Sequence, residues 1–195
     1  QNVQNVYLVK WFFSTAAFVL FYLFAVLALA GFFWGQEPVE EDRRGLDVTF
    51  AVDVSRSMLA DDVAPSRLAR SKGLIRGMVE ELPASRFALV VFKGQGITAM
   101  PMTQDTTAIQ NFLESVGPSL LSSPGSDIES GLSTALNAFP DVLARNRVVV
   151  LFSDGESLTG RAAEAARTAA ERGIPVFSVG VGTEEGSAII RDNGE

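Results

Sequence analysis

The chain has 195 residues, enough for one domain and an additional segment. It contains no Cys and no His, which excludes disulfides, thiol nucleophiles, Ser-His-Asp relays and zinc sites built from thiolate or imidazole. There are 23 acidic and 16 basic side chains, and the net charge of −7 argues against a nucleic-acid partner, since phosphate binding needs clustered Lys and Arg. The chemistry that remains relies on carboxylate and hydroxyl oxygens.

The N-terminal part carries a long apolar run. All of the acidic residues lie at or beyond Glu37, and residues 11–34 contain no charged side chain. As a helix this run is about 36 Å long, against a bilayer core of about 30 Å. Trp11 and Trp34 stand at its two ends, where indole rings prefer the membrane interface. The sequence therefore predicts a transmembrane helix at 11–34, with an N-terminal flank at 1–10 and a linker at 35–45.

Two other interpretations of this run are less consistent with the sequence. A cleaved signal peptide would use Lys10 as its basic region and 28–30 (Ala-Leu-Ala) as its cleavage site, but the apolar run continues through 32–34. A buried core helix fits poorly with the acidic segment that follows. On a strict count of flanking positive charges Arg43 and Arg44 outnumber Lys10, but residues expected upstream of Gln1 could change that count, so the side of the membrane stays open.

Beyond residue 45 short apolar runs alternate with helical spacing. Such alternation predicts an α/β fold with a doubly wound, mostly parallel sheet covered by helices on both faces. The run 97–102 follows a tight turn at 94–96, which predicts one antiparallel edge strand. The expected strands are 46–54, 86–92, 97–102, 147–152 and 174–181, and the expected helices are 66–82, 105–116, 126–139 and 159–172.

Three helix ends carry recognisable capping residues. Asp105 is the expected N-cap of its helix. Ser126, with Glu129 three residues later, has the spacing of a capping box. Gly173 has the position of a C-terminal cap that closes the helix 159–172.

Polar residues cluster just after the predicted strands, where a doubly wound sheet binds its ligands. If the strands 46–54 and 147–152 are neighbours, three separate loops converge at one sheet edge. Two carboxylates placed together repel, and a divalent cation removes that penalty. Mg²⁺, or alternatively Mn²⁺ or Ca²⁺, prefers such hard oxygen donors. The converging residues are Asp53, Ser55, Ser57, Ser126 and Asp154.

This donor pattern resembles the metal-ion-dependent adhesion site of von Willebrand factor A (VWA) domains. The pattern consists of Asp53-x-Ser55-x-Ser57, a hydroxyl in a middle loop and Asp154 in a Ser-Asp-Gly-Glu turn. The middle position is Ser126, whereas the family usually has Thr, so the hydroxyl is retained. The resemblance covers residues 46 to about 182 and implies a Rossmann-like VWA fold that binds a partner protein's acidic residue through the metal. The region 46–195 is then expected to be a VWA domain truncated at its C-terminus.

The flanking sequence is similar to that of one bacterial group within this family. The run Met58–Leu68 and the apolar segment before the domain are similar to the membrane-anchored VWA proteins of the aerotolerance (Bat) group. That resemblance implies location in the bacterial cytoplasmic membrane with a periplasmic VWA domain, and association with other Bat-type proteins. It also implies a MoxR-type AAA+ ATPase as a partner, although such an ATPase is cytoplasmic.

Residues near these donors receive simpler interpretations. Asp61 and Asp62 are expected to form a solvated loop pair, with an electrostatic influence on the metal as the alternative, and Asp127 and Glu156 are expected at the rim of the site. The segment 94–99 fits a Gly-x-Gly-x-x-Ala dinucleotide pattern, but it precedes a strand rather than a helix, so it is rejected.

The sequence favours a binding module without enzymatic activity. The alternative is a magnesium-dependent phosphoryl-transfer enzyme with Asp53 as nucleophile. That mechanism lacks two expected parts, because the residue two positions after Asp53 is Ser55 rather than an acid and no Lys follows Lys93. A third hypothesis is a structural domain that binds no metal.

Overall fold

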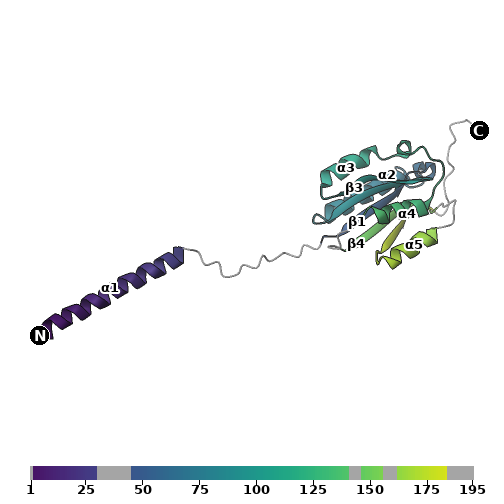
Figure 1. Ribbon diagram of the computed structural model, residues 1–195. Helices are drawn as coiled ribbons and strands as arrows, with labels where there is room; N and C mark the ends of the chain where they lie inside the picture. The colour runs from purple at the N-terminus through teal and green to yellow at the C-terminus, as the bar shows by residue number, and fades with distance from the viewer. Residues whose placement is uncertain (1, 30–44, 141–145, 156–161, 184–195) are drawn as a thin grey trace, which may run out of the picture. The chain divides into compact units, whose positions relative to one another are not determined.

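The computed structural model describes residues 2–29, 45–140, 146–155 and 162–183 (Figure 1). The chain divides into two compact units, Gln1–Asp42 and Arg43–Glu195.

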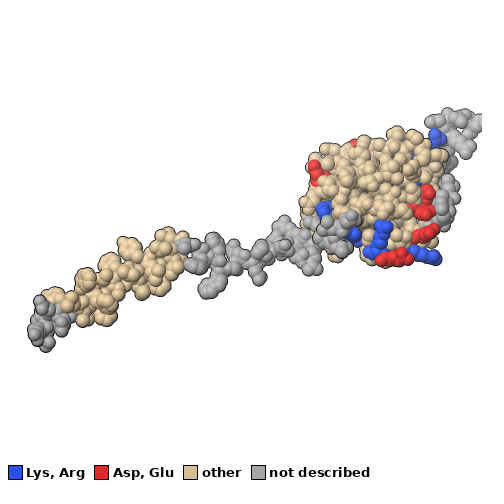
Figure 2. All heavy atoms as spheres, in the orientation of Figure 1, with Lys and Arg blue, Asp and Glu red and all other residues tan. Residues whose placement is uncertain are grey.

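The first unit contains one long helix, α1 (Asn2–Leu29). Its segment Tyr7–Leu29 has a mean hydropathy of 2.3 and is long and apolar enough to cross a membrane. Figure 2 shows almost no charged side chain on its described part, and the hydroxyl of Thr15 donates to the carbonyl of Trp11 at 2.8 Å within the helix. The helix begins earlier than the predicted span, and residues 30–34 of that span lie outside the described residues.

The second unit is built around one sheet of five strands, in the order β3-β2-β1-β4-β5. β1 pairs in parallel with both β2 and β4, β4 pairs in parallel with β5, and β2 pairs with β3 in antiparallel orientation. The strands are β1 (Asp47–Asp53), β2 (Arg86–Phe92), β3 (Gly96–Thr103), β4 (Arg147–Ser153) and β5 (Val176–Gly180). The predicted fold class, including the antiparallel edge strand, is confirmed.

Helices cover both faces of the sheet (Figure 1). Phe50, Phe87 and Phe152, from three adjacent strands, are fully buried on one face with residues of α2 and α3. Phe92 lies on the opposite face with apolar residues of α4 and α5. The helices are α2 (Arg67–Glu81), α3 (Thr106–Ser115), α4 (Ile128–Asn137) and α5 (Ala162–Glu171), with short 3₁₀ turns η1 (Arg56–Leu59) and η2 (Pro118–Leu120).

Capping is predicted correctly for α3 and incorrectly for α4. Asp105 caps α3 by accepting from the amide of Ala108 at 2.9 Å. The N-cap of α4 is Asp127, whose carboxylate accepts from the amide of Ser130 at 3.2 Å. The predicted capping box with Ser126 is therefore wrong by one residue, and the Ser126 hydroxyl is left for another contact.

The sheet has its topological switch point at β1. The chain leaves β1 toward β2 on one side and returns to β4 on the other. The register pairs Val52 with Phe152, so the carboxyl ends of β1 and β4 lie level with each other. Ligands of doubly wound sheets bind in the crevice at such a point.

Close packing between α4 and the sheet depends on Gly131. A methyl group at this position would lie 2.5 Å from the ring of Phe92, which is fully buried. We expect Gly131→Ala to destabilise the domain by about 1–3 kcal/mol, because the ring has no room to move. Urea unfolding of the chain in detergent, followed by circular dichroism, measures this loss.

Gly77→Ala in α2 is the matched control. Nothing lies within 4 Å of a methyl group at this position, so we expect stabilisation by up to about 1 kcal/mol from helix propensity. Equal effects of the two substitutions would contradict the packing argument.

Candidate metal site

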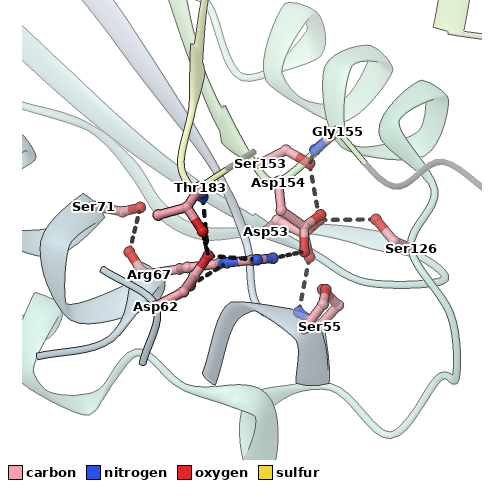
Figure 3. A network of polar contacts seen from close by, with 11 residues as sticks. Asp53, Ser55, Asp62, Arg67, Ser71, Ser126, Ser153, Asp154, Gly155 and Thr183 are labelled. Carbon is pink, nitrogen blue, oxygen red and sulfur yellow. Dashed lines mark hydrogen bonds and ion pairs between the residues drawn. The ribbon is translucent and has the colours of Figure 1, made fainter. Parts of the chain in front are cut away.

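Asp53 is the centre of the site, at the last position of β1, and it is fully buried. Its Oδ1 accepts the backbone N–H of Ser55 at 2.8 Å. Its Oδ2 accepts the hydroxyl of Ser126 at 2.8 Å and the hydroxyl of Ser153 at 3.1 Å. This one carboxylate therefore contacts all three segments that meet at the switch point (Figure 3).

Ser55 and Ser57 lie in the turn that follows β1. Their hydroxyls are 2.9 Å apart and hydrogen-bonded to each other, and both residues are buried. The turn is closed by the amide of Met58, which donates to the carbonyl of Ser55 at 3.2 Å. Met58 is itself fully buried in the core, so it anchors the turn that presents the two hydroxyls.

The middle loop is held against the hairpin between β2 and β3. The amide of Asp127 donates to the carbonyl of Lys93 at 2.7 Å. A methyl group on Gly94 would lie 2.1 Å from the carbonyl oxygen of Pro124, so only glycine allows this approach. The hairpin thereby positions Ser126 over the end of β1.

Asp154 follows the end of β4 and lies beside Asp53 (Figure 3). The chain turns immediately afterwards at Gly155, whose φ of 84° favours glycine. The amide of Gly155 donates to the hydroxyl of Ser153 at 3.1 Å. The Asp154 Oδ2 also accepts from the Nη1 of Arg67 at 3.1 Å.

Electrostatics at the site favour an added positive charge. Burial raises the pKa of Asp53, and the negative charge of Asp154 raises it further, while hydrogen bonds from Ser55 and Ser126 lower it in part. Carboxylates of this kind are held in the ionised form at a cost, which a bound cation offsets.

The structure brings together all five predicted donors, Asp53, Ser55, Ser57, Ser126 and Asp154. Within the described residues no three carboxylates cluster, so the donor set is mixed carboxylate and hydroxyl oxygen. Hard oxygen donors from several loops, including two carboxylates, fit Mg²⁺, Mn²⁺ or Ca²⁺. Asp127 acts as a helix cap, and Glu156 lies outside the described residues.

Four further residues of this network are missing from the sequence-based site. Ser153 lies level with Asp53, but only the strand register reveals this. Asp62 is not a solvated loop residue as expected, because its side chain is only 6% exposed and binds Arg67. It also accepts from the amide and the hydroxyl of Thr183, at 2.9 and 3.1 Å. Arg67 carried one usable signal: a cation in the first turn of a helix opposes the helix dipole and indicates another partner.

The fold and the arrangement of the oxygen donors at the switch point were compared with those of known protein families. Residues 48–156 match the von Willebrand factor type A domain family. The chain belongs to this family, as its motif indicated.

Individual relatives lie within the Bat-type group. The crystal structure of a conserved hypothetical protein, BatB, from Bacteroides thetaiotaomicron superposes with a TM-score of 0.73 at 41% identity, covering 76% of this chain and 73% of that one. An aerotolerance-related membrane protein from Bacteroides fragilis gives a TM-score of 0.73 at 36% identity, over 76% of this chain and 74% of its own. The resemblance to Bat-type membrane proteins is thus confirmed.

Curated relatives are longer than this chain. A UPF0353 protein of Mycobacterium avium is 30% identical over 190 residues, which are 91% of this chain and 55% of the relative. The chain spans about half the length of the curated relatives that it matches. Among more distant folds, proximal thread matrix protein 1 from the mussel byssus, solved with a zinc-occupied adhesion-site motif, has a TM-score of 0.61 at 24% identity and covers 73% of this chain and 37% of that one.

Removing the charge of Asp53 and removing the charge of Asp154 should change the stability of the metal-free protein in opposite directions. Asp53→Asn removes a buried charge that burial disfavours, and the serine hydroxyls around it can accept as well as donate, so we expect higher stability. Asp154→Asn removes an ionic partner of Arg67, so we expect a loss of roughly 1–3 kcal/mol. Thermal unfolding with chelator present measures both, and a rise for Asp154→Asn with a fall for Asp53→Asn would contradict this assignment.

Proposed function

We propose that this protein is a membrane-anchored VWA domain that binds a divalent cation and uses it to bind a protein partner. The observation that supports this proposal most strongly is the set of hydrogen bonds that the Asp53 carboxylate accepts. At 2.8–3.1 Å they connect the turn after β1, the middle loop and the end of β4. The proposed ligands are Asp53, Ser55, Ser57, Ser126 and Asp154.

The donor chemistry supports Mg²⁺ as the ion, with Mn²⁺ or Ca²⁺ as alternatives. All the proposed donors are oxygen atoms, and the chain contains neither Cys nor His. Mg²⁺ is commonly held by one or two carboxylates together with other oxygen ligands, which leaves a position for an incoming group. The zinc reported in the distant byssus protein supports a divalent ion in a site of this type.

A partner's carboxylate is proposed as that incoming group. Arg56 and Leu59 are both exposed in η1, on either side of buried Ser57, and offer an acidic partner one cation and one apolar contact. The net charge of −7 favours a partner with basic residues around its acidic anchor. The proposed partners are other Bat-type membrane proteins or a MoxR-type AAA+ ATPase.

Binding is favoured over catalysis by the surroundings of Asp53. The carboxylate is fully buried, and both of its oxygens accept hydrogen bonds. A phosphoryl-transfer nucleophile needs an oxygen that reaches the substrate. We therefore propose that Asp53 holds the ion and takes no covalent part in a reaction.

Metal binding is expected to stabilise the protein and to require the carboxylates. At a metal concentration of 100 times the Kd, the expected gain is about 2.7 kcal/mol. We expect Asp53→Ala combined with Asp154→Ala to abolish the thermal shift caused by Mg²⁺ or Mn²⁺. The same variant should lose those partners that the wild type captures from membranes with Mg²⁺ and releases with chelator.

Asp61→Asn is the matched control for this experiment. Asp61 is an exposed acid in the same loop region, and its removal should change neither the shift nor the capture. A wild-type protein with no thermal shift would refute the metal site, whereas Mg²⁺-dependent phosphatase turnover lost in Asp53→Asn would establish the enzymatic alternative.

We further propose that residues 11–34 span the bacterial cytoplasmic membrane and that, after a linker at 35–45, the VWA domain from residue 46 lies in the periplasm. The chain contains no Cys, so a single Ala166→Cys change on the exposed side of α5 provides a unique label. We expect a membrane-impermeant maleimide to label this residue in intact spheroplasts. Labelling only after lysis would place the domain in the cytoplasm, on the side of the ATPase.

A further inference from the structure

A buried arginine lies directly beside the proposed metal site. Arg67 donates through Nε and Nη2 to the two carboxylate oxygens of Asp62, both at 2.8 Å. Its remaining terminal nitrogen, Nη1, donates to Asp154 at 3.1 Å. The guanidinium is thus shared between one proposed metal ligand and one acid outside the proposed ligand set (Figure 3).

This ionic triad, Asp62–Arg67–Asp154, is shielded from water and fixed on several sides. The exposed fractions of the Arg67, Asp62 and Asp154 side chains are 10%, 6% and 2%. Thr183, beyond β5, donates twice to Asp62, and a methyl group on Gly182 would lie 3.3 Å from the guanidinium. Charges this well shielded interact more strongly than charges on an open surface.

The position of Arg67 is not explained by the stability of α2. It is the first residue of that helix, where a positive charge opposes the helix dipole. The helix is capped independently, because the Ser66 hydroxyl accepts from the amide of Ala69 at 3.1 Å. A guanidinium carries its charge throughout the physiological range, so Arg67 is a permanent cation beside the site.

We propose that Arg67 is a resident counter-cation for Asp154 that competes with the divalent ion, and that Asp62 sets the strength of this competition. The proposal rests on the proposed function, since it concerns the affinity of the same site. Arg67 is a positioning residue here: it acts on the ion through Asp154 and contributes no ligand.

The competition follows from charge. In the metal-free protein Arg67 offsets the repulsion between Asp154 and Asp53, so the carboxylates stay together without an ion. When an ion binds, it shares Asp154 with a second positive charge, which weakens binding. Asp62 neutralises that charge through its bidentate contact, so its removal should strengthen the hold of Arg67 on Asp154 and weaken metal binding further.

Removing Arg67 and removing the charge of Asp62 should therefore have opposite effects. We expect Arg67→Gln to tighten Mn²⁺ binding by about tenfold or more, because a unit positive charge that touches a ligand acts on the ion at short range. Asp62→Asn should weaken binding by a similar factor. Arg67→Lys keeps the charge and should stay near the wild-type affinity.

A double-mutant cycle on the full-length chain tests this dependence. The probe is Mn²⁺ alone, titrated into wild type, Arg67→Gln, Asp62→Asn and the double variant in detergent, with free Mn²⁺ read by electron paramagnetic resonance. In the Arg67→Gln background the effect of Asp62→Asn should shrink, since Asp62 acts mainly through Arg67. Equal effects of Asp62→Asn in both backgrounds, or weaker binding by Arg67→Gln, would overturn the proposal.

Arg86→Gln is the matched control. Arg86 makes the same bidentate contact with buried Asp47, at 2.8 and 2.6 Å, but at the opposite end of β1. This substitution removes an equal charge and a bidentate ion pair of the same kind, so we expect it to lower stability and to leave Mn²⁺ affinity unchanged. If Arg86→Gln changed the Mn²⁺ affinity as much as Arg67→Gln does, the effect would come from the net charge of the protein and not from the position of Arg67, and the proposal would be overturned.

The outcomes separate this inference from the proposed function. A wild type that binds no Mn²⁺ refutes the metal site itself. A wild type that binds Mn²⁺, with Arg67→Gln binding no tighter, refutes only the role of Arg67. If Arg67→Gln fails to fold, Asp62→Asn decides the question, because unchanged affinity in that variant contradicts the competition.

Discussion

The repulsion between two buried carboxylates is the constraint around which this site is organised. Parallel pairing of β1 with β4 brings Asp53 and Asp154 to one sheet edge, where burial and mutual charge raise the pKa of Asp53. Two contacts reduce this repulsion. The carboxylate of Asp53 accepts hydrogen bonds from serine hydroxyls, and the carboxylate of Asp154 is paired with the guanidinium of Arg67. Charge in a site of low dielectric must be balanced locally, and these contacts supply part of the balance that the proposed ion would complete.

The two ends of β1 show how the same ion pair serves different purposes. At the start of the strand Asp47 is fully buried and is matched by Arg86 alone among the contacts described, a closed pair that joins β1 to β2. At the far end Arg67 is divided between Asp62 and Asp154. The closed pair of Asp47 and Arg86 contributes only to the stability of the fold. Arg67, which is shared with the proposed ligand Asp154, links the stability of the metal-free site to its affinity for a metal ion.

Most elements of the fold follow from the sequence because their signals are local. Alternating apolar runs located the strands, and the tight turn at 94–96 fixed the antiparallel edge. The same local reasoning gave the wrong N-cap for α4. Ser126 was predicted to cap the helix, but its hydroxyl donates to the distant carboxylate of Asp53 instead. Asp127, one residue later, takes the cap, since the hairpin carbonyl of Lys93 holds its amide in place.

The sequence by itself predicted oxygen-based chemistry and determined the apolar N-terminal helix and the order of strands and helices, because these depend on composition and on short-range periodicity. It also predicted five donors, through a motif whose spacing reflects a turn. Only the tertiary structure decided that Ser153, Arg67, Asp62 and Thr183 belong to the polar network around these donors. Their contacts link residues separated by as many as 121 positions, and such contacts depend on strand register and on the packing of α2 against the sheet, which no local pattern encodes.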